Sequence, residues 1–439
     1  MKQLLTFCIS VFSLGLMAQE ENHFSLTQAL DYALAHNAQM INASRDVQAA
    51  YAQKWATIAT GLPQVSAESS YQNQLKRPVS LLPGEFFGGE PGTYVPITFG
   101  QKQQMSISAT LNQKIFDGSY IVGVQAIKTF IEISANAKQK TELEIRKAVV
   151  NAYGSVLLLD QSMAIINDNL SVLKQNILET QQLFQQGFAE EEQLEQLEIT
   201  LLQLESQKRN TLQLQSITKQ SFNLLLGRDL TAAFTLTEDL EALAAQHLMK
   251  QPKEDFLLEN SVDYRIAFNQ KEQKRLELKL EKSKYLPTLG AFVNYSTNAF
   301  GNTFEFFNSS QDWYDASILG LNLNIPVFSS FMKRSNTKIK KLQFEQSLTL
   351  LDQKAKQANL EFQQAKSQFE LDVATYNSSK LNLSLAERIA KKNTIKYKEG
   401  VASSFELRQA QLQLYQAQQE YLKSMLDVIN SKTLVETLN

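Results

Sequence analysis

The chain repeats one pattern of residues at a nearly constant distance along its sequence. The segment Leu111–Gly118 is matched by Leu323–Ser330, where the aligned phenylalanines are 212 residues apart. Gly187 is matched in the same way by Gly400, 213 residues further on. A chance likeness would not keep its spacing over such a distance. The sequence therefore predicts one duplicated structural unit rather than a series of unrelated domains.

The positions of proline indicate what the duplicated unit contains. No proline occurs between Pro96 and Pro252 or after Pro326. Proline interrupts helices, so these gaps allow very long ones. The segments 119–185 and 331–398 are rich in Gln, Glu, Lys, Leu and Ala, which favour helix. At ~1.5 Å per residue, each predicted helix is ~100 Å long.

Four stretches of about ten residues alternate between apolar and polar side chains, as in strands that cross a bilayer at a tilt. One face of each stretch, apolar except for Ser69, is formed by Val65, Ala67, Ser69 and Tyr71; Met105, Ile107, Ala109 and Leu111; Leu289, Ala291, Val293 and Tyr295; and Leu319, Leu321, Leu323 and Ile325. The polar set is interrupted once, by Phe292. A soluble antiparallel sheet with one wet face would show the same alternation.

Four strands in lipid leave two unpaired edges, which hydrocarbon does not tolerate. Several copies must then share one barrel, and three copies would give 12 strands around a water-filled lumen. Two copies would give eight strands around a filled interior. The connections 75–102 and 298–315 are expected to be long external loops, and their aromatic residues fit an interfacial belt equally well.

Glycines are expected to end the long helices and reverse the chain. Phe184 precedes Gly187 and Tyr397 precedes Gly400 by three residues each. This is the pattern of a helix C-cap, so each half should contain one long helical hairpin. Gly227 should end the first return helix. Glutamines on the return helices fit a solvated face and, in an assembly, the wall of an aqueous duct.

The first residues are typical of a secretory signal, with Lys2 followed by a short apolar run that Ser10 and Ser13 interrupt. The only cysteine, Cys8, lies within it, so disulfide and thiol chemistry are excluded. The net charge of −2 gives no reason to expect nucleic acid as a partner. Beyond the signal, the sequence suggests no apolar run long enough for a spanning helix.

The predicted organisation follows from these features. It comprises a signal peptide (1–18), a first repeat (19–230), a connector (231–255) and a second repeat (256–439), with strand regions 64–115 and 288–326 forming the barrel part. A helix over about 256–284 should lead into the second strand pair. The three histidines, His23, His36 and His247, stand apart without metal-ligand spacing. We therefore expect no enzyme activity, no metal site and no cofactor.

In these features the chain resembles the outer-membrane efflux proteins of the TolC type. The resemblance covers nearly the whole mature chain. It rests on the run Phe24–Leu30 with Asn37, on the Leu-Pro before each strand pair and on the Phe before each long helix. The tip segments Phe184–Phe188 and Tyr397–Leu407 complete it.

The resemblance implies a homotrimer with a 12-strand outer-membrane β-barrel, four strands per chain, continued by a long α-helical barrel in the periplasm. It implies a duct whose tip is closed at rest and is engaged by a periplasmic adaptor (membrane fusion protein) attached to an inner-membrane transporter. By this resemblance the tip and adaptor contacts fall on Phe184, Gly187, Phe188, Tyr397, Gly400 and Val401, and the channel aperture on Gln193, Glu406 and Gln409.

The tip departs from the family pattern at several positions. Glu406 stands where the type member has one aperture aspartate, and Gln409 where it has the second. The family's arginine–aspartate closing contact falls on Ala402 and Gln193, which cannot form it. The acidic run Glu190–Glu192 could contribute to another closure, although acids are also favoured at a helix N-terminus.

The leading functional hypothesis is a passive exit duct of a tripartite efflux or type I secretion system in the outer membrane. Its cargo, whether drug, metal or protein, is left open. The alternative is a secreted coiled-coil scaffold with a small soluble β-domain. The duct hypothesis predicts an oligomer that needs detergent and dissociates on heating, while the scaffold hypothesis predicts a protein that is soluble in plain buffer.

Overall fold

The computed structural model describes residues 23–249 and 256–438. The predicted signal peptide and part of the predicted connector lie outside the described residues. The helices are α1 (Leu26–His36), α2 (Ala38–Ala59), α3 (Gly118–Gln185), α4 (Glu191–Leu226), α5 (Leu240–Met249), α6 (Val262–Ser283), α7 (Met332–Lys398) and α8 (Ser404–Leu438). The two very long helices that the proline gaps predicted are confirmed as α3 and α7.

The strands are β1 (His23–Phe24), β2 (Gln64–Asn73), β3 (Val79–Pro83), β4 (Tyr94–Thr98), β5 (Gln103–Phe116), β6 (Thr235–Leu236), β7 (Thr288–Gly301) and β8 (Tyr314–Asn324), and two short 3-10 helices are η1 (Gly84–Phe87) and η2 (Leu258–Asn260). The predicted helix over about 256–284 is shorter, because η2 occupies its expected first turn and Ser261 Oγ accepts from Tyr264 N. These elements form two compact units.

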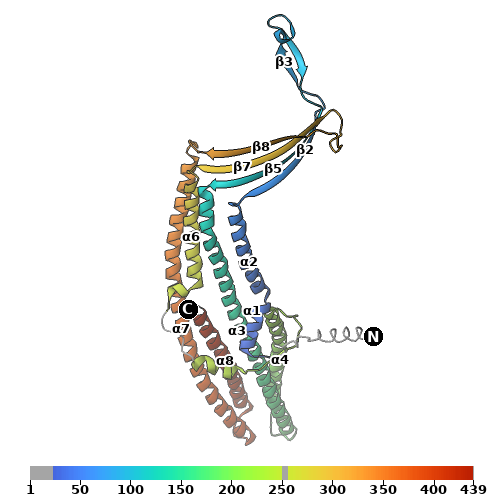
Figure 1. Ribbon diagram of the computed structural model, residues 1–439. Coiled ribbons are helices and arrows are strands. Elements are labelled where there is room, and N and C mark those ends of the chain that lie inside the picture. Colours follow the sequence, from blue (N-terminus) through green and yellow to red (C-terminus); the bar gives the residue numbers. More distant parts are fainter. Residues whose placement is uncertain (1–22, 250–255, 439) are drawn as a thin grey trace, which may run out of the picture. The chain divides into compact units, whose positions relative to one another are not determined.

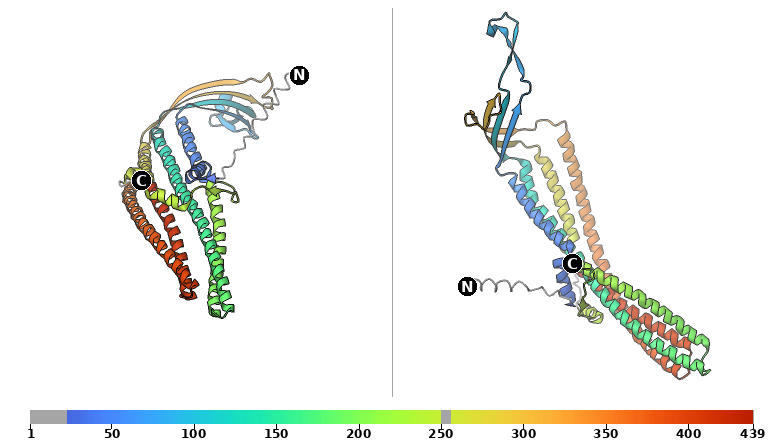
Figure 2. Two further views of the ribbon diagram at one scale, coloured as in Figure 1. Left: turned by 90° about the horizontal axis from the view of Figure 1, so that it is seen from below. Right: turned by 90° about the vertical axis from the view of Figure 1, so that its right-hand side faces the viewer.

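One unit contains residues 48–133 and 269–349 and is built on a four-stranded antiparallel sheet. The strand order is β2-β5-β7-β8, and the curved sheet is seen in Figures 1 and 2. The strand pairs from the two repeats therefore meet where β5 pairs with β7. Within the described chain, β2 and β8 have no strand on their outer sides. The four predicted strands are confirmed.

The same unit contains regular structure within the long connection predicted over 75–102. Strands β3 and β4 pair there as a separate hairpin, with η1 at its turn (Figure 1). Alternating apolar residues and the compact Gly84–Gly89 turn, whose ends are joined by the bond Gly89 N to Gly84 O, favour this hairpin. The extra residues of the first repeat thus form an ordered element.

The other unit contains residues 23–47, 134–268 and 350–438 and is mainly helical. Its largest buried side chains include Tyr153 of α3, Phe222 of α4 and Phe24. The Tyr153 hydroxyl donates to the carbonyl of Phe24 at 3.0 Å. This core, together with Leu240 and Met425, holds α3, the C-terminal end of α4, α5 and α8 against the N-terminal segment.

The N-terminal sequence run has a structural explanation in this core. Ser25 and Gln28 form a capping box at the start of α1, and Ala29 and Ala33 are fully buried on its inner face. Asn37 Nδ2 donates to the carbonyl of Leu225 at 2.8 Å. The run therefore anchors α1 against the end of α4.

Helix α3 corrects one expectation from the sequence. By length and composition, a stretch of it could cross a membrane, although we expected no such run. Half of that stretch is buried inside the fold, where Val149, Tyr153 and Val156 belong to the hydrophobic core. Its apolar character is that of a core helix.

Candidate functional site

Two helix reversals, at Gly187 and Gly400, form the tips of the helical unit. At the first, Phe188 N donates to Leu183 O and Gly187 N to Phe184 O. At the second, Val401 N donates to Lys396 O and Gly400 N to Tyr397 O. Both glycines are left-handed, with φ of 79° and 72°. These are Schellman motifs, which use glycine because a Cβ is disfavoured at such φ angles.

The residue after each tip glycine exposes an apolar side chain. Phe188 is 79% and Val401 is 73% exposed. In a Schellman motif this residue commonly packs back on its own helix. Neither side chain is covered in this unit, and Phe184 is also exposed. Of the residues that the resemblance assigns to the tips, Phe184, Phe188 and Val401 thus expose apolar side chains.

Polar contacts join the two long helices just before their tips. The Tyr397 hydroxyl of α7 lies 2.5 Å from Thr180 Oγ1 of α3, and Lys398 Nζ lies 3.4 Å from a carboxylate oxygen of Glu179. The sequence identified Tyr397 but not Thr180, whose partner is 217 residues away. Tyr397 therefore contacts α3 through Thr180, whereas Gln193 lies in α4.

Acidification should weaken this contact. A hydrogen bond from Gln175, followed by the contact with Lys398, holds the pKa of Glu179 below its ordinary value of 4.5. The carboxylate therefore stabilises the folded contact above that pH, and the contribution is lost as pH falls through the lowered pKa. The Glu179 side chain is half-buried and that of Lys398 is exposed, so solvent screens the pair and we expect a loss of less than ~1 kcal/mol.

Hydrogen–deuterium exchange near Glu179 tests this expectation. Corrected for the intrinsic pH dependence, exchange at the end of α3 should be faster at acidic pH than at neutral pH. The Glu179→Gln variant should lose this response because its side chain does not titrate. An equal response in the variant would assign the effect to other groups.

Of the predicted aperture residues, Gln193 and Glu406 lie in the first turns of α4 and α8, and Gln409 lies in the second turn of α8. Glu406 Oε2 accepts from the backbone N–H of Ser403 at 2.8 Å, and Ser403 Oγ accepts from the N–H of Glu406 at 3.3 Å. This is a capping box, whose Ser-x-x-Glu signature was readable in the sequence but was not recognised. Glu406 and Gln409 are exposed, and Gln193 is half-buried.

The acidic run beside Gln193 also has a local explanation. Helix α4 begins at Glu191, with Glu190 at its N-cap position and Glu191 and Glu192 in its first turn. Negative side chains there interact favourably with the helix dipole. Glu192 accepts a hydrogen bond from Gln196 at 2.9 Å. This placement agrees with the prediction that the run starts a helix.

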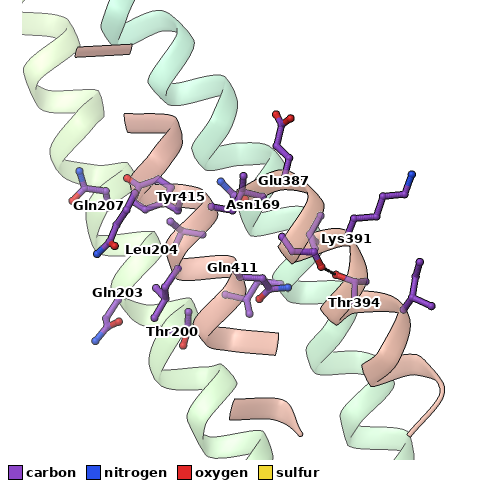
Figure 3. Close-up of a pocket in the computed structure, with 17 residues that line it drawn as sticks. Asn169, Thr200, Gln203, Leu204, Gln207, Glu387, Lys391, Thr394, Gln411 and Tyr415 are labelled. Carbon is purple, nitrogen blue, oxygen red and sulfur yellow. Dashed lines mark hydrogen bonds between the residues drawn. The ribbon is translucent and has the colours of Figure 1, made fainter. Parts of the chain in front are cut away.

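A cavity of about 730 Å³ lies among α3, α4, α7 and α8, between the tips and the core of the helical unit. Figure 3 shows Gln203, Leu204 and Gln207 of α4 on one side of it and Gln411 and Tyr415 of α8 beside them. Among the described residues, Gln411 Nε2 and the Tyr415 hydroxyl are buried without a hydrogen-bond partner. Burial raises the pKa of Tyr415. The four helices are thus incompletely packed at this level.

The sheet of the other unit separates polar from apolar side chains. Its register aligns Val65, Leu111, Val293 and Leu319 in one row across all four strands. All four are exposed. The opposite face carries the row Glu68, Ser108, Ser296 and Ala316. A curved sheet with one exposed apolar face and unpaired edges is suited to lipid on one side and water on the other.

One further feature concerns the polar face of the sheet. The ring of Phe292, which interrupts the polar pattern, lies over Gly320, where an added Cβ would come within 2.3 Å of it.

The described residues contain no group of three or more His, Cys, Asp or Glu side chains that could hold a metal ion.

The sheet, the long helical hairpins and the exposed tips together define the class of outer-membrane export channels. Residues 256–437 match the model of the family described as outer membrane efflux protein. The second half of the chain carries this family's sequence pattern, and the resemblance to TolC-type proteins is confirmed.

Solved structures extend the likeness to the whole fold. The outer membrane protein VceC of Vibrio cholerae has 15% sequence identity and a TM-score of 0.72, with 94% of this chain and 95% of that chain covered. The CmeC outer membrane channel of Campylobacter jejuni has 16% identity and a TM-score of 0.73, with 94% and 85% covered. The open state of the MtrE outer membrane channel of Neisseria gonorrhoeae has 15% identity and a TM-score of 0.73, with 94% and 88% covered.

A comparison with curated protein sequences finds no match. The fold of these channels confirms the predicted fold class for the single chain, four strands of an outer-membrane β-barrel continued by long helical hairpins. The family match supports the predicted efflux channel in the outer membrane and gives no support to the soluble scaffold.

Proposed function

We propose that three copies of this chain form the exit duct of a tripartite efflux or type I secretion system. The four-stranded sheets join edge to edge in the outer membrane, and the helical hairpins extend into the periplasm. The observation that carries this proposal is the sheet itself, which has one exposed apolar face and two unpaired edges. Neither feature is stable in a lone copy.

The tips are proposed as the docking surface of a periplasmic adaptor, which links the duct to an inner-membrane transporter. Support comes from the exposed apolar side chains of Phe184, Phe188 and Val401, which lie at the two hydrogen-bonded helix reversals. Tyr397, Gly187 and Gly400 shape these turns. The duct is passive in this proposal, so its partners supply the energy.

Deletion of the encoding gene, followed by a toxicant panel and a comparison of secreted proteins, tests the function and identifies the cargo. Sensitivity to small toxicants would indicate efflux, and loss of a secreted protein would indicate secretion. The purified protein should be a detergent-dependent trimer that dissociates on heating. A monomer that is soluble in plain buffer would overturn the proposal.

We propose the aperture role of Glu406, together with Gln193 and Gln409, as a separate hypothesis. Glu406→Gln should weaken the block of channel current by multivalent cations, because it removes one carboxylate per copy from the proposed aperture. Glutamine can also complete a capping box, so the helix start should be kept. Bilayer recordings of the blocking curve measure the effect.

Ser403→Ala is the matched control for this substitution. It removes the cap at a cost of about 1 kcal/mol but keeps the charge of Glu406. It should therefore lower the stability of the tip while leaving the cation block nearly unchanged. If both variants changed the block equally, the turn and not the carboxylate would be responsible.

A further inference from the structure

The β3–β4 hairpin presents an apolar surface that none of the described residues covers. Its register pairs Leu81 with Pro96 and Pro83 with Tyr94. Side chains on one side of this pairing form what we call the apolar hairpin face, which consists of Val79, Leu81, Pro83, Tyr94 and Pro96, with Thr98 opposite Val79 at its edge. Leu81 and Tyr94 are each 63% exposed. The face contains no charged residue.

The opposite side of the hairpin is different. It carries Ser80, Leu82, Val95 and Ile97, of which the three apolar residues are half-buried. Among the described elements, η1 is the only one that packs substantially against β3 and β4. An isolated two-stranded hairpin is marginally stable in water. An uncovered apolar face on such an element indicates a binding surface.

The hairpin lies at the end of the sheet away from the helices. Strand β2 begins five residues after α2 ends, and β5 ends two residues before α3 begins. The turn between β2 and β5 is therefore at the opposite end, as is the β7–β8 loop. That loop is held to the sheet by its buried Phe306, whose ring contacts Tyr71. The base of the hairpin contacts it through Lys102 N and Asn302 Oδ1.

In the proposed trimer, three hairpins stand around the external mouth of one barrel. Each follows directly from β2, an edge strand that must join the neighbouring copy. A 12-strand barrel has a backbone radius of ~12 Å, from ~4.8 Å between strands and a tilt of ~40°. Hairpin strands of five residues span ~17 Å, so all three can reach the axis.

We propose that the apolar hairpin faces of the three copies pack against one another as a cap over the external mouth of the duct. The occupant of each face is thus a second copy of this chain, brought there by the barrel interface. This inference rests on the proposed trimer. It adds a barrier at the external mouth of the duct.

Cross-linking in the intact trimer tests the packing. The only cysteine, Cys8, lies in the predicted signal, so single cysteines can be introduced into an otherwise cysteine-free mature chain. Leu81→Cys lies on the apolar hairpin face, and its neighbour Ser80→Cys on the opposite side is the matched control. With a short bismaleimide, Leu81→Cys should give covalent dimers at a several-fold higher yield than Ser80→Cys.

The outcomes separate the cap from the proposed duct. Trimers in which Leu81→Cys gives no dimer, or no more than Ser80→Cys, would overturn the cap and leave the duct standing. Absence of the trimer in the parent protein would overturn both.

A second measurement uses Ser296→Cys on the polar face of the sheet. A maleimide attached to a bulky polymer should label the Ser296→Cys variant from outside the cell. Labelling should be several-fold faster when residues 79–98 are replaced by a short Gly-Ser linker than when the hairpin is present. Unchanged labelling in intact trimers would contradict a closed mouth.

Discussion

Leu111→Arg is expected to prevent assembly of the trimer in the outer membrane. Leu111 lies in the exposed apolar row of the sheet, between Val65 and Val293. An arginine that faces lipid costs ~2–4 kcal/mol at the middle of the membrane and less near its surfaces. Because a trimer contains three such arginines, the total cost is comparable with the free energy of unfolding of many proteins.

Ser108→Arg is the matched control, three residues away on the polar face of the same strand. Its cross-strand neighbour is Glu68, which can pair with the new charge. We expect this variant to assemble and to change only conductance or ion selectivity. The yield of heat-dissociable trimer in isolated outer membranes measures both variants. Equal yields would show that the apolar row does not face lipid.

The sheet could be predicted because strand alternation and turn spacing are local signals. The register pairs the strands so that apolar residues such as Val65, Leu111, Val293 and Leu319 lie side by side on one face, as the alternation requires. The long helices were equally predictable from the absence of proline. Local chemistry also specified the helix ends at Gly187, Gly227 and Gly400, and all three have positive φ.

The site was less predictable because its contacts join distant segments. No local pattern connects Thr180 with Tyr397, or reveals that α3, α4, α7 and α8 leave a cavity near Tyr415. The left-handed conformations of Ser330 and Phe331 also have no sequence signal, since neither residue is glycine. The capping box of Ser403 and Glu406, in contrast, has a local signature, the pattern Ser-x-x-Glu, and it gives Glu406 a structural role besides the proposed aperture role.

Gly400→Val is expected to impair export strongly while the barrel remains assembled. Valine at a φ of 72° is disfavoured by about 1–3 kcal/mol, and it would shift the backbone bonds that Gly400 and Val401 make to the end of α7. A turn that loses 1.4 kcal/mol in its docking conformation binds a partner about tenfold more weakly. Each trimer has three such turns.

Two companion variants identify the cause of the defect. Ala402→Val adds the same side chain in the same turn at a residue whose φ is not positive, so export should be close to normal. Gly400→Asn should retain most activity because asparagine tolerates the left-handed conformation. Adaptor affinity in a pull-down and the amount of trimer are measured together. Normal adaptor binding by Gly400→Val would place the docking surface elsewhere, because the strain acts on this turn and on nothing in the sheet.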